Sequence, residues 1–266
     1  MMSHSLTAEQ IRSQNPVVRP NRGLGRFIWV LFSGVFFNPF NIGFAILMPV
    51  IMYLMFGANQ EYSDFSVGNG NVASQVLVSM TLFGMMMTTS SFAANVSLER
   101  AQGVSRLYAL TPMSALFQLV GRMVAILCVG CVVVLITFGV GVATGASMSG
   151  VVWAQSVPIL LAVSTVGIAI GFGCGFAVRS DGAFAATSAI VVLSAFGGGL
   201  TIPLDQMGAF FQSLAPWTPL WGAGQMVLLP IHGWENFTPN MLVNVAIWAA
   251  LFIALAVWGL RRDTGR

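Results

Sequence analysis

The sequence predicts an all-α membrane protein with six transmembrane helices, and three observations predict it. Apolar residues make up 56% of the 266 residues and charged residues only 7%, which excludes an ordinary water-soluble domain. The apolar residues gather in runs near the roughly 20 residues that a helix needs to cross ~30 Å of hydrocarbon. With six such runs taken as spans, every basic residue falls on one side of the membrane.

The chain begins with a polar arm and an amphipathic helix. Residues 1–23 hold Pro16, Pro20 and several Arg residues, and we expect a cytoplasmic N-terminal arm there. From residue 24 to 37 the apolar residues recur at helical spacing, which predicts a helix lying on the membrane surface. Arg26 and Trp29 fall off this apolar stripe, which comprises Leu24, Phe27, Ile28, Leu31, Phe32, Val35 and Phe36. The alternative is that this helix forms the lower part of the first span.

The remaining chain, residues 24–266, is predicted to form one six-span domain. The spans are expected at residues 40–56, 74–96, 115–143, 152–177, 183–202 and 241–260. Three prolines interrupt the apolar segment 204–234, so it does not suit a straight crossing. Gly197, Gly198 and Gly199 allow a bend before it, which favours outer re-entrant helices ahead of the last span.

The placement of charge predicts the orientation. All eleven basic residues are Arg, and the six-span topology puts them on the face that holds both termini. The opposite loops hold only acids, namely Glu61, Asp64, Asp205 and Glu235. By the positive-inside rule the Arg face is cytoplasmic. We expect a multi-pass protein of the cell membrane, of the bacterial cytoplasmic type, with both termini in the cytoplasm.

No catalytic, nucleotide-binding or metal-binding pattern is present. The absence of Lys excludes a Walker phosphate loop, and His4 and His232 lack partners at metal-ligand spacing. No basic run with interleaved aromatic residues indicates nucleic acid. No ionisable residue lies near the middle of a span, as an ion-coupled carrier would need. Arg122, at the cytoplasmic end of the third span, is predicted to face lipid headgroups.

Charge gathers in the middle of the chain only at residues 97–112. Glu99, Arg100 and Arg106 lie there between two long apolar runs, so this stretch must be exposed to water at one membrane face. We expect Arg100, Gln102 and Arg106 to remain in water, while a stripe faces the bundle or a partner: Val104, Leu107, Tyr108 and Thr111. Gly103 permits a turn or a close approach. On spacing alone, an ordinary loop between two spans explains the stretch equally well.

Two features inside the spans concern packing and passage. Gly167, Gly171 and Gly175 form overlapping G-x-x-x-G patterns, which predict close helix contact, more often within one chain than between chains. The second span combines Met residues with Thr and Ser, and its candidate path-lining residues are Met85, Thr88, Thr89 and Phe92. Met surfaces adapt to varied apolar ligands, although Met more commonly fills a helix interface.

Three stretches resemble a known family. They are MPVIMYLMFG (48–57), ERAQGVSRLYALTP (99–112) and GGGLTIPLDQM (197–207). They resemble, in order, the Pro-containing first span, the Glu-Arg-x-x-Gly…Leu-x-x-Thr-Pro motif and the fifth span with its re-entrant helices in type-2 ABC transporter permeases of the daunorubicin-resistance type. The central motif is the most specific. Gln102 and Gly208 depart from the family pattern, and the first departure bears on the fit to an ATPase.

The resemblance implies a function that the residues alone do not give. The 24–37 helix would be the connecting helix, and residues 99–110 would hold the coupling helix on a separate ATPase. The implied coupling residues are Glu99, Arg100, Gly103, Arg106, Leu107 and Tyr108. The chain would bind no cofactor itself, because ATP and Mg²⁺ would sit on two copies of an ABC ATP-binding subunit. It would pair with a second or sibling permease in membrane lipid, and export a drug, lipid, peptide or glycan. The alternative is an ATP-independent facilitator or a membrane-embedded lipid-modifying enzyme.

Overall fold

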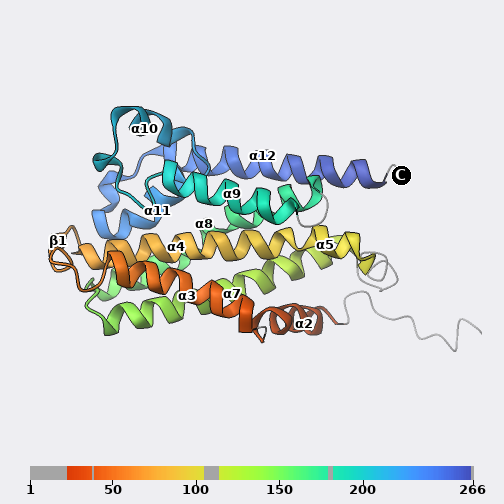
Figure 1. Cartoon of the computed structure of the whole chain (residues 1–266), viewed down its shortest axis with the longest axis horizontal. Coiled ribbons are helices and arrows are strands. Elements are labelled where there is room, and N and C mark those ends of the chain that lie inside the picture. The colour runs from red at the N-terminus through yellow and green to blue at the C-terminus, as the bar shows by residue number, and fades with distance from the viewer. Residues whose placement is uncertain (1–22, 38, 105–113, 179–181, 265–266) are drawn as a thin grey trace, which may run out of the picture.

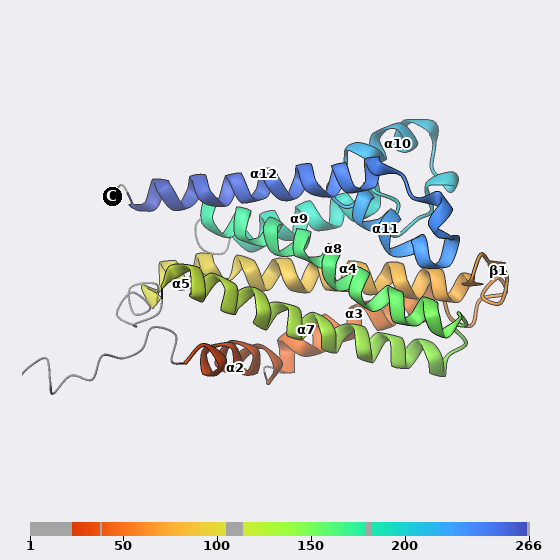
Figure 2. The ribbon, with the colours of Figure 1, turned by 180° about the vertical axis from the view of Figure 1, so that it is seen from behind.

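Long helices lie side by side along one axis, with short helices and a small hairpin at one end (Figures 1 and 2). The computed structural model describes residues 23–37, 39–104, 114–178 and 182–264. The long helices are α3 (Pro39–Phe56), α4 (Val72–Ala94), α7 (Ala115–Ala143), α8 (Gly150–Ala177), α9 (Gly182–Gly197) and α12 (Pro239–Thr264). The amphipathic helix is α2 (Leu24–Phe36), and α5 (Val96–Ala101) follows α4.

The remaining elements lie between these helices. Strands β1 (Ser66–Val67) and β2 (Gly70–Asn71) form an antiparallel hairpin between α3 and α4. Between α9 and α12 come η1 (Leu204–Gln206), α10 (Ala209–Leu214), η2 (Ala215–Trp217), α11 (Trp221–His232) and η3 (Trp234–Asn236). The expected bend is present, because α9 ends at Gly197 and Gly199 has a φ of +79°. The fifth helix is therefore shorter than the predicted 183–202.

Polar caps decide where three of the long helices begin. The side chains of Asn71, Ser114 and Ser149 each accept a hydrogen bond from a backbone N–H in the first turn of α4, α7 and α8. A side-chain oxygen at this position satisfies one of the N–H groups that a helix start leaves unpaired. The polar residues at the ends of the apolar runs thus fix the boundaries, which lie within two residues of the predicted starts.

Four helices in the described residues are long and apolar enough to cross a membrane: Val72–Ala101, Leu116–Ala143, Gly150–Ala177 and Pro239–Arg262. The α9 helix has 16 residues and the α3 helix 18, so at 1.5 Å per residue they extend about 24 and 27 Å. Both lie in the same bundle as the four longer helices (Figure 1). Both helices are shorter than the ~30 Å hydrocarbon core, so six crossings require residues that flank α3 and α9 to span the remaining thickness.

The α4 helix ends at Ala94, two residues before the predicted end of the second span at residue 96. A single turn residue, Asn95, separates α4 from α5; it keeps helical angles (φ −54°, ψ −23°), so that the two helices together reach from Val72 to Ala101. Glu99 and Arg100 thus belong to α5, the short helix that follows α4. The coupling helix expected within residues 99–110 stays a prediction, because residues 105–113 lie outside the described part of the chain.

The α4 helix occupies the centre of the bundle. In the most apolar part of this span 78% of the residues are buried, compared with 17% in α12. The α4 helix packs against α3, α7, α8, α9 and α11. Hydroxyl groups inside it donate to the backbone of their own helix, as Thr81 does to Leu77 O and Thr88 to Gly84 O, each at 2.7 Å. A span with so many Ser and Thr residues can therefore be buried without unpaired polar groups.

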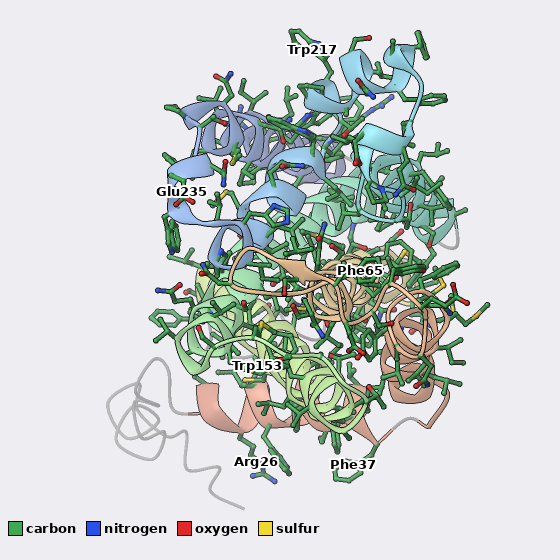
Figure 3. The ribbon with its side chains drawn as sticks, turned by 90° about the vertical axis from the view of Figure 1, so that its left-hand side faces the viewer. Arg26, Phe37, Phe65, Trp153, Trp217 and Glu235 are labelled. Carbon is green, nitrogen blue, oxygen red and sulfur yellow. The ribbon has the colours of Figure 1, made fainter. Side chains whose placement is uncertain are left out.

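The two ends of the bundle differ in charge. The elements that carry the described Arg residues, namely α2, α5, the start of α7 and the end of α12, lie toward one end (Figure 1). The hairpin and α10 lie at the opposite end with the acidic loops, and Phe65 and Glu235 are seen there when that end faces the viewer (Figure 3). We call the Arg-rich end the basic end and the other the acidic end.

Candidate functional site

The candidate site at the basic end is built around an ion pair between α5 and α7. The guanidinium of Arg122 donates from Nη1 to Glu99 Oε1 at 2.8 Å and from Nη2 to Glu99 Oε2. The side chains are only 13% exposed for Arg122 and 21% for Glu99. Two parallel charge-assisted bonds fix both the distance and the orientation of the partners. The prediction that Arg122 faces lipid headgroups is wrong, because a carboxylate one helix away satisfies it.

The next residue, Arg100, ties α5 to α8. Its Nη1 donates to the carbonyl oxygens of Gly175 at 3.1 Å and Phe176 at 3.0 Å, and its guanidinium lies 5.4 Å from the centre of the Phe176 ring. The last carbonyls of a helix carry partial negative charge and lack partners within the helix, so a cation suits them. The expectation that Arg100 remains in water is therefore wrong.

A third contact joins the same elements. Ser97 Oγ donates to Val178 O at 2.8 Å, just beyond the end of α8. Together, Ser97, Glu99 and Arg100 hold one turn of α5 against both α7 and α8. A displacement of this turn would therefore act on two long helices at once.

A cavity of about 80 Å³ lies beside the ion pair. Its apolar wall includes Leu31 and Val35 of α2, and Asn95 stands with Glu99 and Arg122 at its polar edge. Pockets for drug-sized ligands span roughly 300–1,000 Å³, so this cavity accommodates only a few waters or one small group. Its position places α2 next to the ion pair. The seven stripe residues of α2 are half-buried, while Arg26 and Trp29 are exposed, as the periodicity predicted.

The exposed part of the site comes next in the chain, at the end of α5. Ala101 and Gln102 are exposed, and Gly103 has a φ of +74° with no atom within 4 Å of the place a Cβ would take. A positive φ ends the helix at little cost in glycine but not in a residue with a side chain. Arg106, Leu107 and Tyr108, the other predicted coupling residues, lie outside the described residues. Of the predicted set, Glu99, Arg100 and Gly103 are placed at one location.

The glycines of α8 form the seam that supports this site. A Cβ on Gly171 would overlap Ser90 O, one on Gly167 would overlap Thr89 Oγ1, and one on Gly175 would lie 2.7 Å from Val96 Cγ1. The structure therefore places all three against α4 and α5 of the same chain. Close backbone contact along this seam brings the end of α8 within reach of Arg100.

The predicted path-lining residues lie deeper in the bundle. Met85 and Thr89 are fully buried and Thr88 is 5% exposed, and Thr89 faces the α8 seam. Phe92 is half-buried and lines the cavity beside the ion pair. In this conformation Met85 and Thr89 fill a helix interface, and a role in a transport path stays a prediction.

Comparison with known proteins identifies the family. Residues 58–258 match the family described as ABC-2 family transporter protein. The chain belongs to this family. It is therefore a multi-pass membrane protein and a permease of the ABC transporter class. Membrane subunits of the ABC-2 family generally pair with an ABC ATP-binding subunit and are generally non-catalytic.

One relative supports this assignment. The Bacillus subtilis (strain 168) protein YvfS, whose name provisionally describes a transport permease, is 24% identical over 235 residues. The matched region covers 85% of this chain and 92% of YvfS. The similarity thus extends across both proteins and not only across one motif.

The sequence did not reveal the partners inside the ABC-2 permease site. Glu99 and Arg122 are 23 residues apart, on helices separated by residues outside the described range, and no spacing rule joins them. One signal was available, because an Arg in the first turns of an apolar span needs a counter-charge. Ser97 and the carbonyls at the end of α8 carried no signal, since such contacts depend on how the helices pack.

Proposed function

We propose that this chain is the permease of an ATP-driven exporter whose ATP is hydrolysed by a separate subunit. The arrangement that supports the proposal best is the turn of α5 that is bonded to α7 and α8 and adjoins the exposed Gln102. Two permease chains and two ATP-binding subunits would form the complex, and the basic end would face the cytoplasm. Both termini would then be cytoplasmic, with six crossings that include α3 and α9.

Within this proposal the predicted coupling residues divide into two roles. Residues 101–110, including Arg106, Leu107 and Tyr108, would contact the ATPase, and Gly103 would let the chain turn onto it. Glu99 and Arg100 face the permease and would pass the displacement to α7 and α8. A charged pair suits this role, because removing either partner leaves the other charge poorly solvated. The bundle would then rock between inward-open and outward-open states while binding no nucleotide itself.

The transported compound belongs to the proposal only as a broad class. A drug, lipid, peptide or glycan would suit a bundle whose interior is lined by Met, Thr and Phe side chains such as Met85, Thr88 and Phe92. The protein would act in the bacterial cytoplasmic membrane. Export is favoured over import by the family resemblance of the central motif.

Purification in mild detergent from the native membrane tests the proposal. We expect an ABC ATP-binding subunit to co-purify, and native mass spectrometry to give two copies of each chain. We also expect the permease to stimulate ATP hydrolysis by the captured subunit, and Arg122→Glu to remove the stimulation. The charge-swapped variant Glu99→Arg/Arg122→Glu should restore part of it. A permease isolated without any ATP-binding subunit, with no nucleotide-dependent transport in vesicles, would exclude this function.

A further inference from the structure

The hairpin at the acidic end bonds to two helix ends and to one interhelical turn. We call residues 66–71, which comprise β1, its two-residue turn and β2, the outer strap. Helix ends leave backbone N–H and C=O groups without partners inside the helix, and those groups must be satisfied elsewhere. The outer strap supplies these partners to α4, to α11 and to the turn between α7 and α8. It lies at the end of the molecule opposite to α5 (Figure 1).

The outer strap holds α11 through Asn69. The backbone N–H of Asn69 donates to Ile231 O at 2.7 Å, and its Nδ2 donates to Pro230 O at 3.2 Å. Both acceptors belong to the last turn of α11, where carbonyls lack helical partners. Gly68, with a φ of +53°, lies directly against Ile231 O, and a Cβ there would overlap that oxygen. The α11 helix therefore ends on the outer strap.

The outer strap holds α4 and the α7–α8 turn through Asn71. Asn71 Oδ1 accepts from the backbone N–H of Ser74 at 3.0 Å, which caps α4, and also from that of Ser147 at 3.0 Å. Asn71 Nδ2 donates to Gly145 O at 2.9 Å, and Gly70 forms a β-bridge with Met148. Asn71 is 7% exposed, so these bonds are shielded from competing water.

The outer strap is also joined to the candidate site at the other end. Asn71 caps α4, and α4 and α5 together extend over 30 residues to Ala101, about 45 Å, with only Asn95, in helical conformation, between them; the last turn of α5 carries Glu99 and Arg100. We propose that this stretch is a rigid lever, and that Asn69 and Asn71 are positioning residues that join α11 to its outer end. This inference rests on the proposed function. A displacement of α5 by an ATPase would then reach α11 without any opening of the outer strap.

Amide hydrogen exchange of the permease–ATPase complex, with and without a non-hydrolysable ATP analogue, tests the lever. In the unaltered complex, nucleotide should change exchange both in residues 96–104 and in residues 227–236. Asn69→Ala removes the side-chain bond to Pro230 O and should reduce the nucleotide response of 227–236 at least twofold. The response of 96–104 should remain.

Asn236→Ala is the matched control. Asn236 Nδ2 donates to His232 O at 2.8 Å, so this variant removes a bond of the same kind from the same helix end without touching the outer strap. Its response in 227–236 should equal that of the unaltered complex. Equal responses for Asn69→Ala and the unaltered complex, or no response in 227–236 while 96–104 responds, would overturn the lever. Absence of any response in 96–104 would instead contradict the proposed function.

A cross-link gives a second test that does not depend on a weakened variant. Cysteines at positions 69 and 232, placed in a chain without its three native cysteines, would be joined by a short reversible thiol cross-linker. Joining them should restore the nucleotide response of 227–236 that the uncross-linked cysteine pair lacks. If the cross-link instead abolishes the response and a reductant restores it, the outer strap must open during the cycle, and the rigid lever is wrong.

Discussion

Replacing Glu99 by Gln removes one charge from the ion pair with Arg122 while it keeps the size and shape of the side chain. Two unit charges about 4 Å apart interact by about 4 kcal/mol at an effective dielectric constant near 20. The 13% and 21% exposure of the two side chains lets water recover part of this loss. We therefore expect the permease to lose about 2–3 kcal/mol of stability, less than the 3–5 kcal/mol typical of a fully buried pair.

Thermal unfolding of the purified permease in one detergent measures this loss. For a chain of this size a loss of 1 kcal/mol lowers the Tm by about 2–4 °C, so Glu99→Gln should lower it by roughly 5–10 °C. Glu61→Gln is the matched control, because Glu61 is exposed at the acidic end. A double-mutant cycle with Arg122→Met should give a coupling energy above about 1 kcal/mol. Additive effects, or a Glu99→Gln variant as stable as the Glu61→Gln control, would refute this reasoning.

Three further predictions concern the seam, the α8 contact and the acidic end. Gly171→Leu should prevent α8 from packing on Ser90 and lower the yield of folded protein in size-exclusion chromatography, whereas Gly139→Leu, which meets no atom within 4 Å, should not. Arg100→Met should cost about 2 kcal/mol in thermal unfolding by freeing two carbonyls of α8, with a smaller loss if water replaces the guanidinium. Burial lowers the pKa of His232 below 6.5, so the folded state disfavours the charged form. The folded state with neutral His232 is therefore at its full stability above pH 6.5. It loses stability as the pH falls through 6.5 toward the lower pKa of His232 in the folded state. His232→Gln should flatten this part of the Tm-against-pH curve, and an unchanged curve would contradict it.

Hydrophobic runs located the long helices because a membrane imposes both a length and an apolar composition on them. The predicted and observed bounds of the third span agree, since Ser114 caps its start and the turn at 144–149 ends it. The second span was predicted to end at residue 96 and α4 ends at Ala94, but Arg100 beyond it was wrongly expected to remain in water. Glu99 and Arg100 instead stay helical, with their charges satisfied by α7 and α8. Partners on other helices cannot be read from one helix.

The acidic-end hairpin shows a different limit. The sequence indicated only a loop with Glu61 and Asp64 here, although Gly68-Asn69 is a possible two-residue hairpin turn. Strands of two residues carry too little periodicity to be recognised. The bonds that make this hairpin stable reach Ser147 and Ile231, far along the chain. The close contact at the glycines of α8, by contrast, could be predicted, because the sequence itself shows where a small residue lets another helix approach.

Site-specific photo-cross-linking from Gln102 in native membranes tests the central claim most directly. Gln102 is exposed at the end of α5, and Tyr62, which is exposed at the opposite end of the bundle, serves as the control position. We predict that a cross-linker at position 102 captures an ABC ATP-binding subunit, identified by mass spectrometry, and that one at position 62 does not. Capture of that subunit from neither position, or from position 62 instead, would contradict the account.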